Sequence, residues 1–276
     1  MIYIIKKKYK FYIKKKLGQH FLFNKKIINK IIKYLNFNFN DLVLEIGPGL
    51  GSLTFNIVKK INKLYAIEID KNIVNFLNNN YIIRKKVILI TQNAIYLNLK
   101  KLFLKNNQNL FKIIGNLPYN VSTKIILNLV INYIYNIKNM YFMIQKELAE
   151  RIMAKNNTKK YGRLSIIMQY YCKIYKLMEI LPKNFKPIPK VNSYFIKLVP
   201  HKIIFLNILN INMIKYITNK SFNNRRKILN NNIKFLFNNK ELLNLNINLN
   251  SRAENISVKK YYKLSNLLFY KNKYNI

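Results

Sequence analysis

LVLEIGPGLG, residues 42–51, is the part of the sequence that indicates the fold most clearly. Its apolar half predicts a short strand over 42–46, and the residues after it predict a helix over 53–61. Glycines at such a turn let the backbone bend tightly and approach a ligand at the helix N-terminus. The spacing is G-x-G-x-G, which differs from the G-x-G-x-x-G of dinucleotide-binding folds. The segment therefore predicts an α/β fold with a ligand beside this turn.

The rest of the first 200 residues repeats the alternation of strand and helix. A helix is predicted around Ile27–Leu35, because its apolar residues recur at helical spacing. Strands are predicted over 64–69, 87–91, 111–115 and 140–145, with helices starting at residue 73 and covering 123–135. This order predicts a mainly parallel sheet with helices on both faces. Ligands of such sheets bind beyond the carboxyl ends of the strands.

The pattern changes after Pro200. Helices are predicted over 214–222, 225–237 and 258–269, and no strand is evident. We therefore expect a larger domain over 1–200, with a basic N-terminal arm, and a small helical domain over 201–276.

The charge of the chain is extreme. Among 276 residues, 50 are basic and nine acidic, for a net charge of +41. Such a field attracts polyanions and makes their binding dependent on salt. Lys, Asn, Ile, Tyr and Phe are abundant and Trp is absent, as expected under AT-rich mutational pressure. The charge alone therefore does not establish RNA binding.

Other composition features exclude whole classes of protein. Cys172 is the single cysteine, which rules out an internal disulfide, and two histidines with few acids make a metal site implausible. No apolar run approaches the roughly 18 to 20 residues of a membrane span. The basic N-terminus has the wrong order for a secretory signal. We expect an intracellular protein with no membrane partner and no metal.

An acid follows the glycine turn at the distance expected of a nucleotide site. Glu68 ends the predicted strand over 64–69, about twenty residues after Gly47 and Gly49, where an acid can accept hydrogen bonds from both ribose hydroxyls. Together these residues fit either a nicotinamide cofactor or S-adenosylmethionine.

The tetrapeptide Asn116-Leu117-Pro118-Tyr119 distinguishes the two cofactors. It follows the predicted strand over 111–115, so it lies at the same sheet edge. The lone pair of an adenine amine is delocalised, and acceptors that hold its hydrogens favour a nucleophilic geometry in line with a sulfonium methyl. The Asn116 oxygen and a carbonyl next to Pro118 can act as these acceptors, while Tyr119 can stack on the base. The motif indicates methylation of an adenine amine.

With these motifs the chain resembles the family of ribosomal RNA adenine dimethyltransferases, over about residues 16–269. The resemblance rests on LGQHFL (17–22), EIGPGLGSLT (45–54), AIEID (66–70), GNLPYNVST (115–123), QKELAERI (145–152), YGRLS (161–165), NFKPIPKVNS (184–193), SFNNRRK (221–227) and RAENIS (252–257). It implies a Rossmann-like class I methyltransferase sheet with a small all-α C-terminal domain. It also implies dimethylation of two adjacent adenines near the 3′ end of small-subunit ribosomal RNA.

The resemblance implies roles for individual residues. The S-adenosylmethionine contacts would be His20, Leu22, Gly47, Gly49, Glu68, Asn93 and Asn116. Asn93 stands where the family usually has Asp, so we expect modestly weaker cofactor binding. Phe185 would hold the target base against Tyr119. Arg225, Arg226 and Lys227, expected on a helix, would contact RNA phosphates.

The implied partner is small-subunit ribosomal RNA or the pre-assembled small subunit, bound by a monomer in a bacterial cytoplasm, with an organelle as the other setting. Two other functions remain open: methylation of adenine in large-subunit RNA or DNA, and a catalytically silent RNA-binding factor on the same scaffold. The intact Gly47, Glu68, Asn116 and Tyr119 argue against the silent factor.

Overall fold

The fold is taken from a computed structural model, which describes residues 14, 17–106, 110–201 and 211–274. Backbone contacts divide the chain into two units, 1–146 with 175–200, and 147–174 with 201–276. The chain passes between the units three times, after residues 146, 174 and 200, whereas the sequence predicts one boundary near His201. The contact-based units differ from the expected ranges by residues 147–174, because the helix over 163–171 packs against the helices over 211–221 and 258–274.

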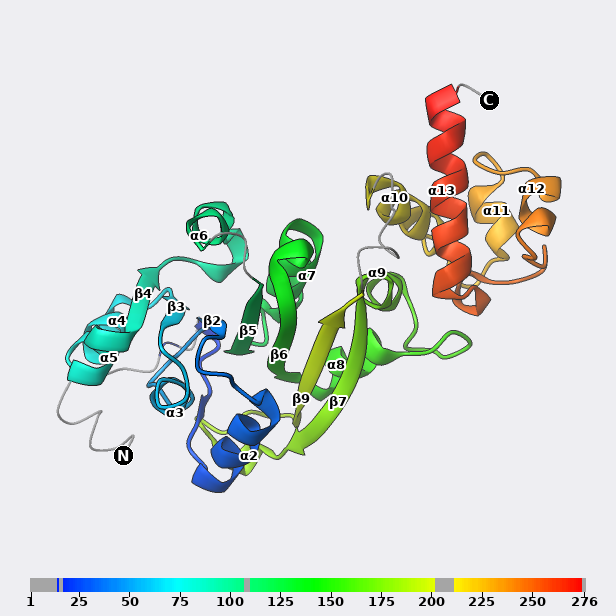
Figure 1. The fold of residues 1–276 in the computed structure, drawn as a ribbon. Helices are drawn as coiled ribbons and strands as arrows, with labels where there is room; N and C mark the ends of the chain where they lie inside the picture. The colour runs from blue at the N-terminus through cyan, green and yellow to red at the C-terminus, as the bar shows by residue number, and fades with distance from the viewer. Residues whose placement is uncertain (1–13, 15–16, 107–109, 202–210, 275–276) are drawn as a thin grey trace. The chain divides into compact units, whose positions relative to one another are not determined.

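A seven-stranded sheet in the order β4-β3-β2-β5-β6-β9-β7 forms the centre of the first unit (Figure 1). Its strands are β2 (Leu42–Ile46), β3 (Leu64–Glu68), β4 (Val87–Thr91), β5 (Phe111–Asn116), β6 (Ile137–Gln145), β7 (Cys172–Ile180) and β9 (Ser193–Pro200). The strands from β4 to β6 are parallel to their neighbours, as predicted, whereas β9 runs antiparallel to β6. Strands β7 and β9 were not predicted. Because β9 runs antiparallel to β6, the sheet is mixed at this side.

Helices cover both faces of the sheet. The first unit contains α2 (Lys25–Leu35), α3 (Thr54–Ile57), α4 (Lys71–Asn78), α5 (Tyr81–Lys86), α6 (Lys100–Lys105) and α7 (Ser122–Tyr133). Ile114 of β5 belongs to the buried cluster that includes α2. Phe111 points to the opposite face, where its ring lies 5.1 Å from that of Phe103 in α6, which in turn lies 5.6 Å from the ring of Tyr133 in α7.

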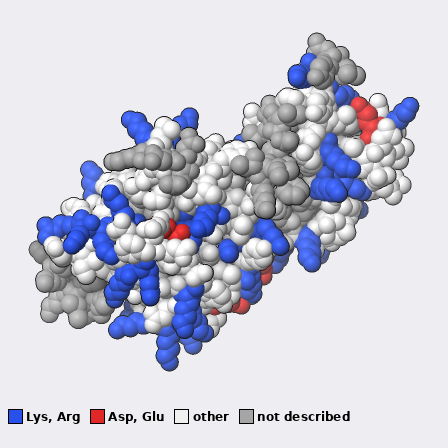
Figure 2. All heavy atoms as spheres, in the orientation of Figure 1, with Lys and Arg blue, Asp and Glu red and all other residues white. Residues whose placement is uncertain are grey.

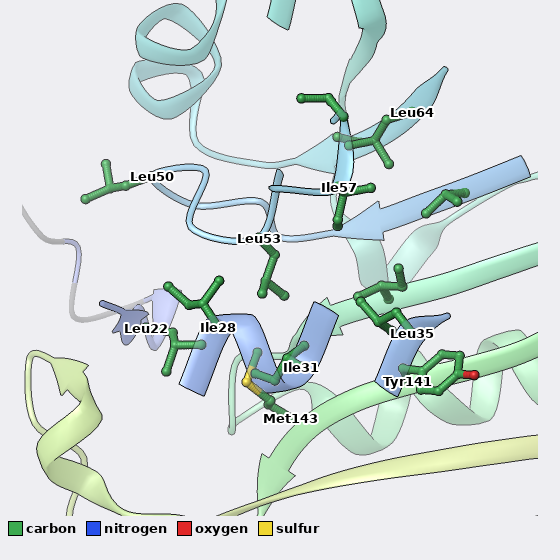
Figure 3. Close-up of a cluster of buried hydrophobic side chains, with 14 of the residues drawn as sticks. Leu22, Ile28, Ile31, Leu35, Leu50, Leu53, Ile57, Leu64, Tyr141 and Met143 are labelled. Atoms are coloured by element: carbon green, nitrogen blue, oxygen red, sulfur yellow. The ribbon is translucent and has the colours of Figure 1, made fainter. Parts of the chain in front are cut away.

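Helix α2 forms because its ends are capped and one face is apolar. The Asn24 side chain accepts from the Lys26 and Ile27 N–H groups, and Asn36 ends the helix in the left-handed conformation. Ile31 and Leu35 are completely buried and point into the core (Figure 3). The core cluster drawn there joins α2 to the residues around α3 and to strands β3 and β6.

The helix predicted over 53–61 is much shorter in the structure. Only Thr54–Ile57 is helical. The Lys60 N–H donates to the Ile57 carbonyl three residues back, which tightens the chain into a turn leading to β3.

The second unit contains α8 (Lys146–Met153), α9 (Arg163–Tyr171), α10 (Ile211–Ser221), α11 (Leu229–Ile233), α12 (Asn239–Asn244) and α13 (Val258–Tyr274). The prediction of a continuous helix over 225–237 is wrong, because only α11 is helical within it. Ile228 instead forms a β-bridge with Arg252, and the Asn232 amide donates to the carbonyls of Ser221 and Asn224. These competing hydrogen bonds hold residues 222–227 in a turn. Within the described ranges, no helix is long and apolar enough to cross a membrane.

Candidate active site

A cavity of about 290 Å3 opens at the carboxyl ends of β2, β3, β4 and β5. Ten of the residues predicted for catalysis or cofactor binding line it: His20, Leu22, Gly47, Gly49, Glu68, Asn93, Asn116, Leu117, Pro118 and Tyr119. The sheet brings them together because parallel strands end at one edge, although the residues span a hundred positions of the chain.

The glycine turn after β2 adopts a conformation that favours glycine. Gly47 and Gly49 have φ of 70° and 54°, in the left-handed region. The Gly47 N–H donates to the Ile67 carbonyl (2.9 Å), which joins the turn to the end of β3. A Cβ atom on Gly49 would lie 2.9 Å from the ring of Phe21. The turn therefore packs against the N-terminal segment at the cavity wall, and Gly49 makes this approach possible.

Glu68 is held by backbone donors at the end of β3. Its Oε1 accepts from the N–H groups of Ile69 (2.9 Å) and Asp70 (3.0 Å), and its Oε2 accepts from Gly49 (3.3 Å). Burial raises the pKa of Glu68 above its usual value, and the three backbone N–H groups oppose this shift. The carboxylate is thus fixed in orientation at the wall of the cavity.

Asn116 and Tyr119 are oriented by contacts outside their own motif. The Asn116 Nδ2 donates to the His20 carbonyl (2.7 Å), and the Tyr119 hydroxyl lies 2.6 Å from the Ser193 Oγ. The His20 ring stacks on Tyr119, with ring centroids 5.3 Å apart and planes at 26°. Burial raises the pKa of Tyr119, and the hydrogen bond with Ser193 opposes this shift. The phenol therefore stays protonated and offers a ring face at the cavity.

The two residues between them form the turn that leads into α7. The Leu117 N–H donates to the Met143 carbonyl (3.1 Å), which ties the end of β5 to β6. Pro118 carries no N–H, and its carbonyl accepts from Val121 and Ser122 at the start of α7. The motif is thus a rigid strand-to-helix connection.

Phe185 does not lie where the resemblance implies. Its side chain is fully buried in the core cluster, and it is absent from the cavity lining. It belongs to β8 (Phe185–Lys186), which pairs with Leu22 and Phe21 of β1 (Phe21–Leu22). This pairing turns the ring into the core. Here the ring facing Tyr119 is His20, whose Nδ1 lies 2.8 Å from the Pro187 carbonyl.

Asn93 lies at the cavity, but its oxygen already has a partner. The side chain caps the short 3₁₀ helix η2 (Ala94–Tyr96) by accepting from the Ile95 N–H at 3.0 Å. An amide oxygen has two lone pairs, so one is left for a donor such as the adenine amine of a cofactor. An aspartate would offer a second oxygen, and weaker cofactor binding with Asn93 stays a prediction.

Glu45, which belongs to the glycine motif, was not predicted as a site residue. Glu45 lines the cavity and is 2% exposed. Burial, with a smaller contribution from the Glu68 charge, raises its pKa to about 7 against the hydrogen bond from Thr54 Oγ1 (2.8 Å). An acid kept inside a buried strand, among only nine in the chain, was the available signal.

The three basic residues predicted to bind RNA lie in the second unit and differ in their contacts. Arg225 donates to Glu254 Oε2 from Nε (2.9 Å) and Nη2 (2.7 Å), and also to the Lys159 carbonyl. Its guanidinium is thus occupied by the protein itself. Arg226 and Lys227 are exposed in the adjoining turn. The expectation that all three lie on a helix is wrong, because residues 222–227 form a turn.

Basic side chains are spread widely over the described surface. Figure 2 shows many lysines and arginines on the visible face of each unit and few acids. Where residues are described, no group of three His, Cys, Asp or Glu side chains could hold a metal.

Comparison with known proteins gives the family. The model of the family described as ribosomal RNA adenine dimethylase matches residues 10–269. Ribosomal RNA small subunit methyltransferase A of Buchnera aphidicola subsp. Acyrthosiphon pisum (strain APS) is 46% identical, over 94% of this chain and 93% of that protein. The protein of the same name from Wigglesworthia glossinidia brevipalpis is 45% identical, over 93% of this chain and 98% of its own length.

The fold of this chain is also similar to that of a solved structure. A dimethyladenosine transferase from Plasmodium falciparum superposes with a TM-score of 0.78 and 25% identity, over 92% of this chain and 98% of that one. The match extends through both units of the present chain. The chain therefore belongs to the ribosomal RNA adenine dimethylase family.

Proposed function

We propose that this protein transfers methyl groups from S-adenosylmethionine to the exocyclic amines of two adjacent adenosines in the 3′-terminal hairpin loop of small-subunit ribosomal RNA. The observation that carries the proposal is the position of Asn116 and Tyr119 in one cavity with Gly47 and Glu68. Family membership and the names of the bacterial relatives support the substrate. An enzyme of this kind would act during biogenesis of the small subunit.

The cavity residues suit each part of this reaction. The cofactor supplies a methyl group activated by its sulfonium. Glu68 would bind the ribose, Asn93 the adenine, and the segment with His20 and Leu22 would cover the methionine end. Because Asn116 Nδ2 is held by the His20 carbonyl, its Oδ1 is oriented to accept from the target amine. Leu117 would supply the second acceptor through its carbonyl.

The target base would stack on Tyr119. With its hydrogens held by Asn116 Oδ1 and the Leu117 carbonyl, the amine nitrogen would be placed to receive the activated methyl group, and its proton would pass to water. A loop adenine is already partly unstacked, so moving it into the cavity costs little compared with a duplex base. No metal is required for this transfer, because the methyl donor is already activated.

The decisive experiment supplies the protein with S-adenosylmethionine and three substrates: unmodified small subunits, large subunits and duplex DNA. We expect transfer to small subunits only, with two dimethylated adenines found by mass spectrometry of the 3′-terminal RNA fragment. Preferred transfer to large subunits or DNA would replace the substrate proposed here. Binding of S-adenosylmethionine without transfer to any of the three would favour a silent RNA-binding factor.

We further propose that the protein works as a monomer. We also propose that its setting is a bacterial cytoplasm, and the bacterial sources of its relatives support this setting. Light scattering on the purified protein at micromolar concentration measures its mass in solution. A mass twice that of one chain would contradict the proposal of a monomer.

A further inference from the structure

Residues 17–22, here called the strap, form one wall of the cavity, and all six line it. One end of the strap is built into the fold. Phe21 and Leu22 pair with β8, the Leu22 carbonyl accepts from Ser52 Oγ, and the His20 carbonyl accepts from Asn116. This end is therefore held through its main chain, by strand pairing and by two side chains that donate to its carbonyls.

The other end of the strap depends on a single carboxylate. Asp70 accepts from Gln19 Nε2 (3.1 Å) through Oδ2 and from Lys14 Nζ (2.7 Å) through Oδ1. The Gln19 Oε1 in turn accepts from the Lys14 N–H (2.9 Å), and the Leu17 N–H donates to the Lys14 carbonyl (3.0 Å). The Asp70 side chain is fully buried, whereas that of Lys14 is 44% exposed.

Between its two ends the strap lies against the catalytic motif. Gly18 has φ of 61°, and a Cβ atom there would lie 3.1 Å from Asn120 Oδ1 and 3.6 Å from Pro118 Cβ. The strap thus reaches from the end of β3 to the turn after β5, across the carboxyl edge of the sheet. A ligand in the cavity would lie under it.

Asp70 is also joined to the proposed cofactor contact. Its N–H donates to Glu68 Oε1, so the residue that fastens the strap and the residue that would bind the ribose share one turn. We propose that Asp70 is a positioning residue that fastens the strap over the cofactor and limits how fast the cofactor leaves. This inference rests on the proposed function, because it takes the ligand to be S-adenosylmethionine or its demethylated product, S-adenosylhomocysteine.

The test is Asp70→Asn, measured by the dissociation rate of S-adenosylhomocysteine from the full-length protein. The asparagine oxygen can still accept from the Asn72 N–H and cap α4, as Asp70 does now (3.1 Å). It loses the charge that attracts Lys14, and its amide faces the Gln19 amide. Loss of these hydrogen bonds to a charged group should make S-adenosylhomocysteine dissociate about tenfold faster. We expect the KM for S-adenosylmethionine to rise while kcat at saturating cofactor stays within about twofold.

Two further variants make the result specific. Lys14→Met removes the charged partner of Asp70, and we expect dissociation about two- to fivefold faster, since this ion pair is partly exposed to solvent. Lys71→Met removes an exposed charge next to Asp70 and should leave the rate unchanged. An unchanged rate in both Asp70→Asn and Lys14→Met would overturn the role of Asp70. Failure of the unaltered protein to bind S-adenosylhomocysteine would instead overturn the proposed function.

Discussion

Asn116 illustrates how one side chain acquires a defined direction. Its Nδ2 donates to the His20 carbonyl at 2.7 Å, so rotation of the amide is restrained and Oδ1 is left to accept from another donor. We predict that Asn116→Ala lowers methyl transfer by roughly 100-fold or more, as removal of a single oriented hydrogen-bonding group at a reacting centre does. RNA affinity should change by less than about twofold, because phosphate contacts dominate it. Rates on small subunits and filter binding measure the two effects.

Asn132→Ala, on the exposed face of α7, is the matched control and should retain full activity. A near-normal rate for Asn116→Ala would contradict the role given to that amide.

Glu45 gives a prediction about pH at the same scale. Its pKa is about 7 in the folded protein and near 4.5 when unfolded, so between these values only the folded state keeps the proton. The free energy of unfolding therefore contains a contribution that decreases as pH rises from about 4.5 to 7. Glu45→Gln removes this titration. The stability of the variant relative to the unaltered protein should therefore rise by on the order of 3 kcal/mol between pH 4.5 and pH 8. Urea unfolding at both pH values tests this, and a pH-independent difference would contradict it.

At the scale of elements, strand β5 must lie close to β2 for the site to form. Gly115 pairs with Ile46, and a Cβ atom on Gly115 would lie 2.7 Å from the Ile46 carbonyl oxygen, which belongs to backbone and cannot rotate away. We predict that Gly115→Ala pushes β5 from β2, displaces Asn116, lowers the free energy of unfolding by about 1–3 kcal/mol and abolishes most activity. Chemical denaturation and the transfer assay measure both changes.

Gly162→Ala is the control for that substitution. Its nearest neighbour would be the Phe222 ring at 4.0 Å, and its φ is not in the left-handed region. The variant should be stable and active. If both alanine variants behaved alike, the close approach of β5 and β2 would not explain the requirement for glycine.

At the scale of the whole molecule, the net charge of +41 makes RNA binding a sum over many phosphates. Substitution of Arg226 and of Arg225 should distinguish an RNA contact from a structural role. Arg226→Ala should weaken RNA binding and lower the slope of log K against log salt by about 1, with unchanged cofactor affinity. Arg225→Ala should mainly lower thermal stability, because its guanidinium holds Glu254 and the Lys159 carbonyl. Titrations at several salt concentrations and melting curves distinguish the two.

A salt slope unchanged in Arg226→Ala would remove that residue from the RNA contacts. A large loss of slope in Arg225→Ala, with stability unchanged, would reverse the roles of the two arginines.

The sequence by itself determined the parallel strands, the glycine turn and the position of Glu68 and Asn116 at one edge. These follow from local patterns, since hydrophobic periodicity and turn residues act over a few positions. The run YFIKLV at 194–199 was an available local signal for β9. Strand β7 is more polar, and its place beside β9 in the sheet rather than a local pattern makes it a strand. The same applies to the turn at 222–227, where contacts of Ile228 and Asn232 override helical spacing.

Tertiary structure alone decided which side chains face the cavity. Phe185 turns into the core because β8 pairs with β1, and Glu45 titrates near pH 7 because the fold buries it beside Glu68. Asp70, an ordinary strand-end acid in the sequence, becomes the partner of Lys14 and Gln19 only when the strap lies over the sheet edge. Such contacts join residues more than fifty positions apart, and their energies depend on burial, which no local pattern contains.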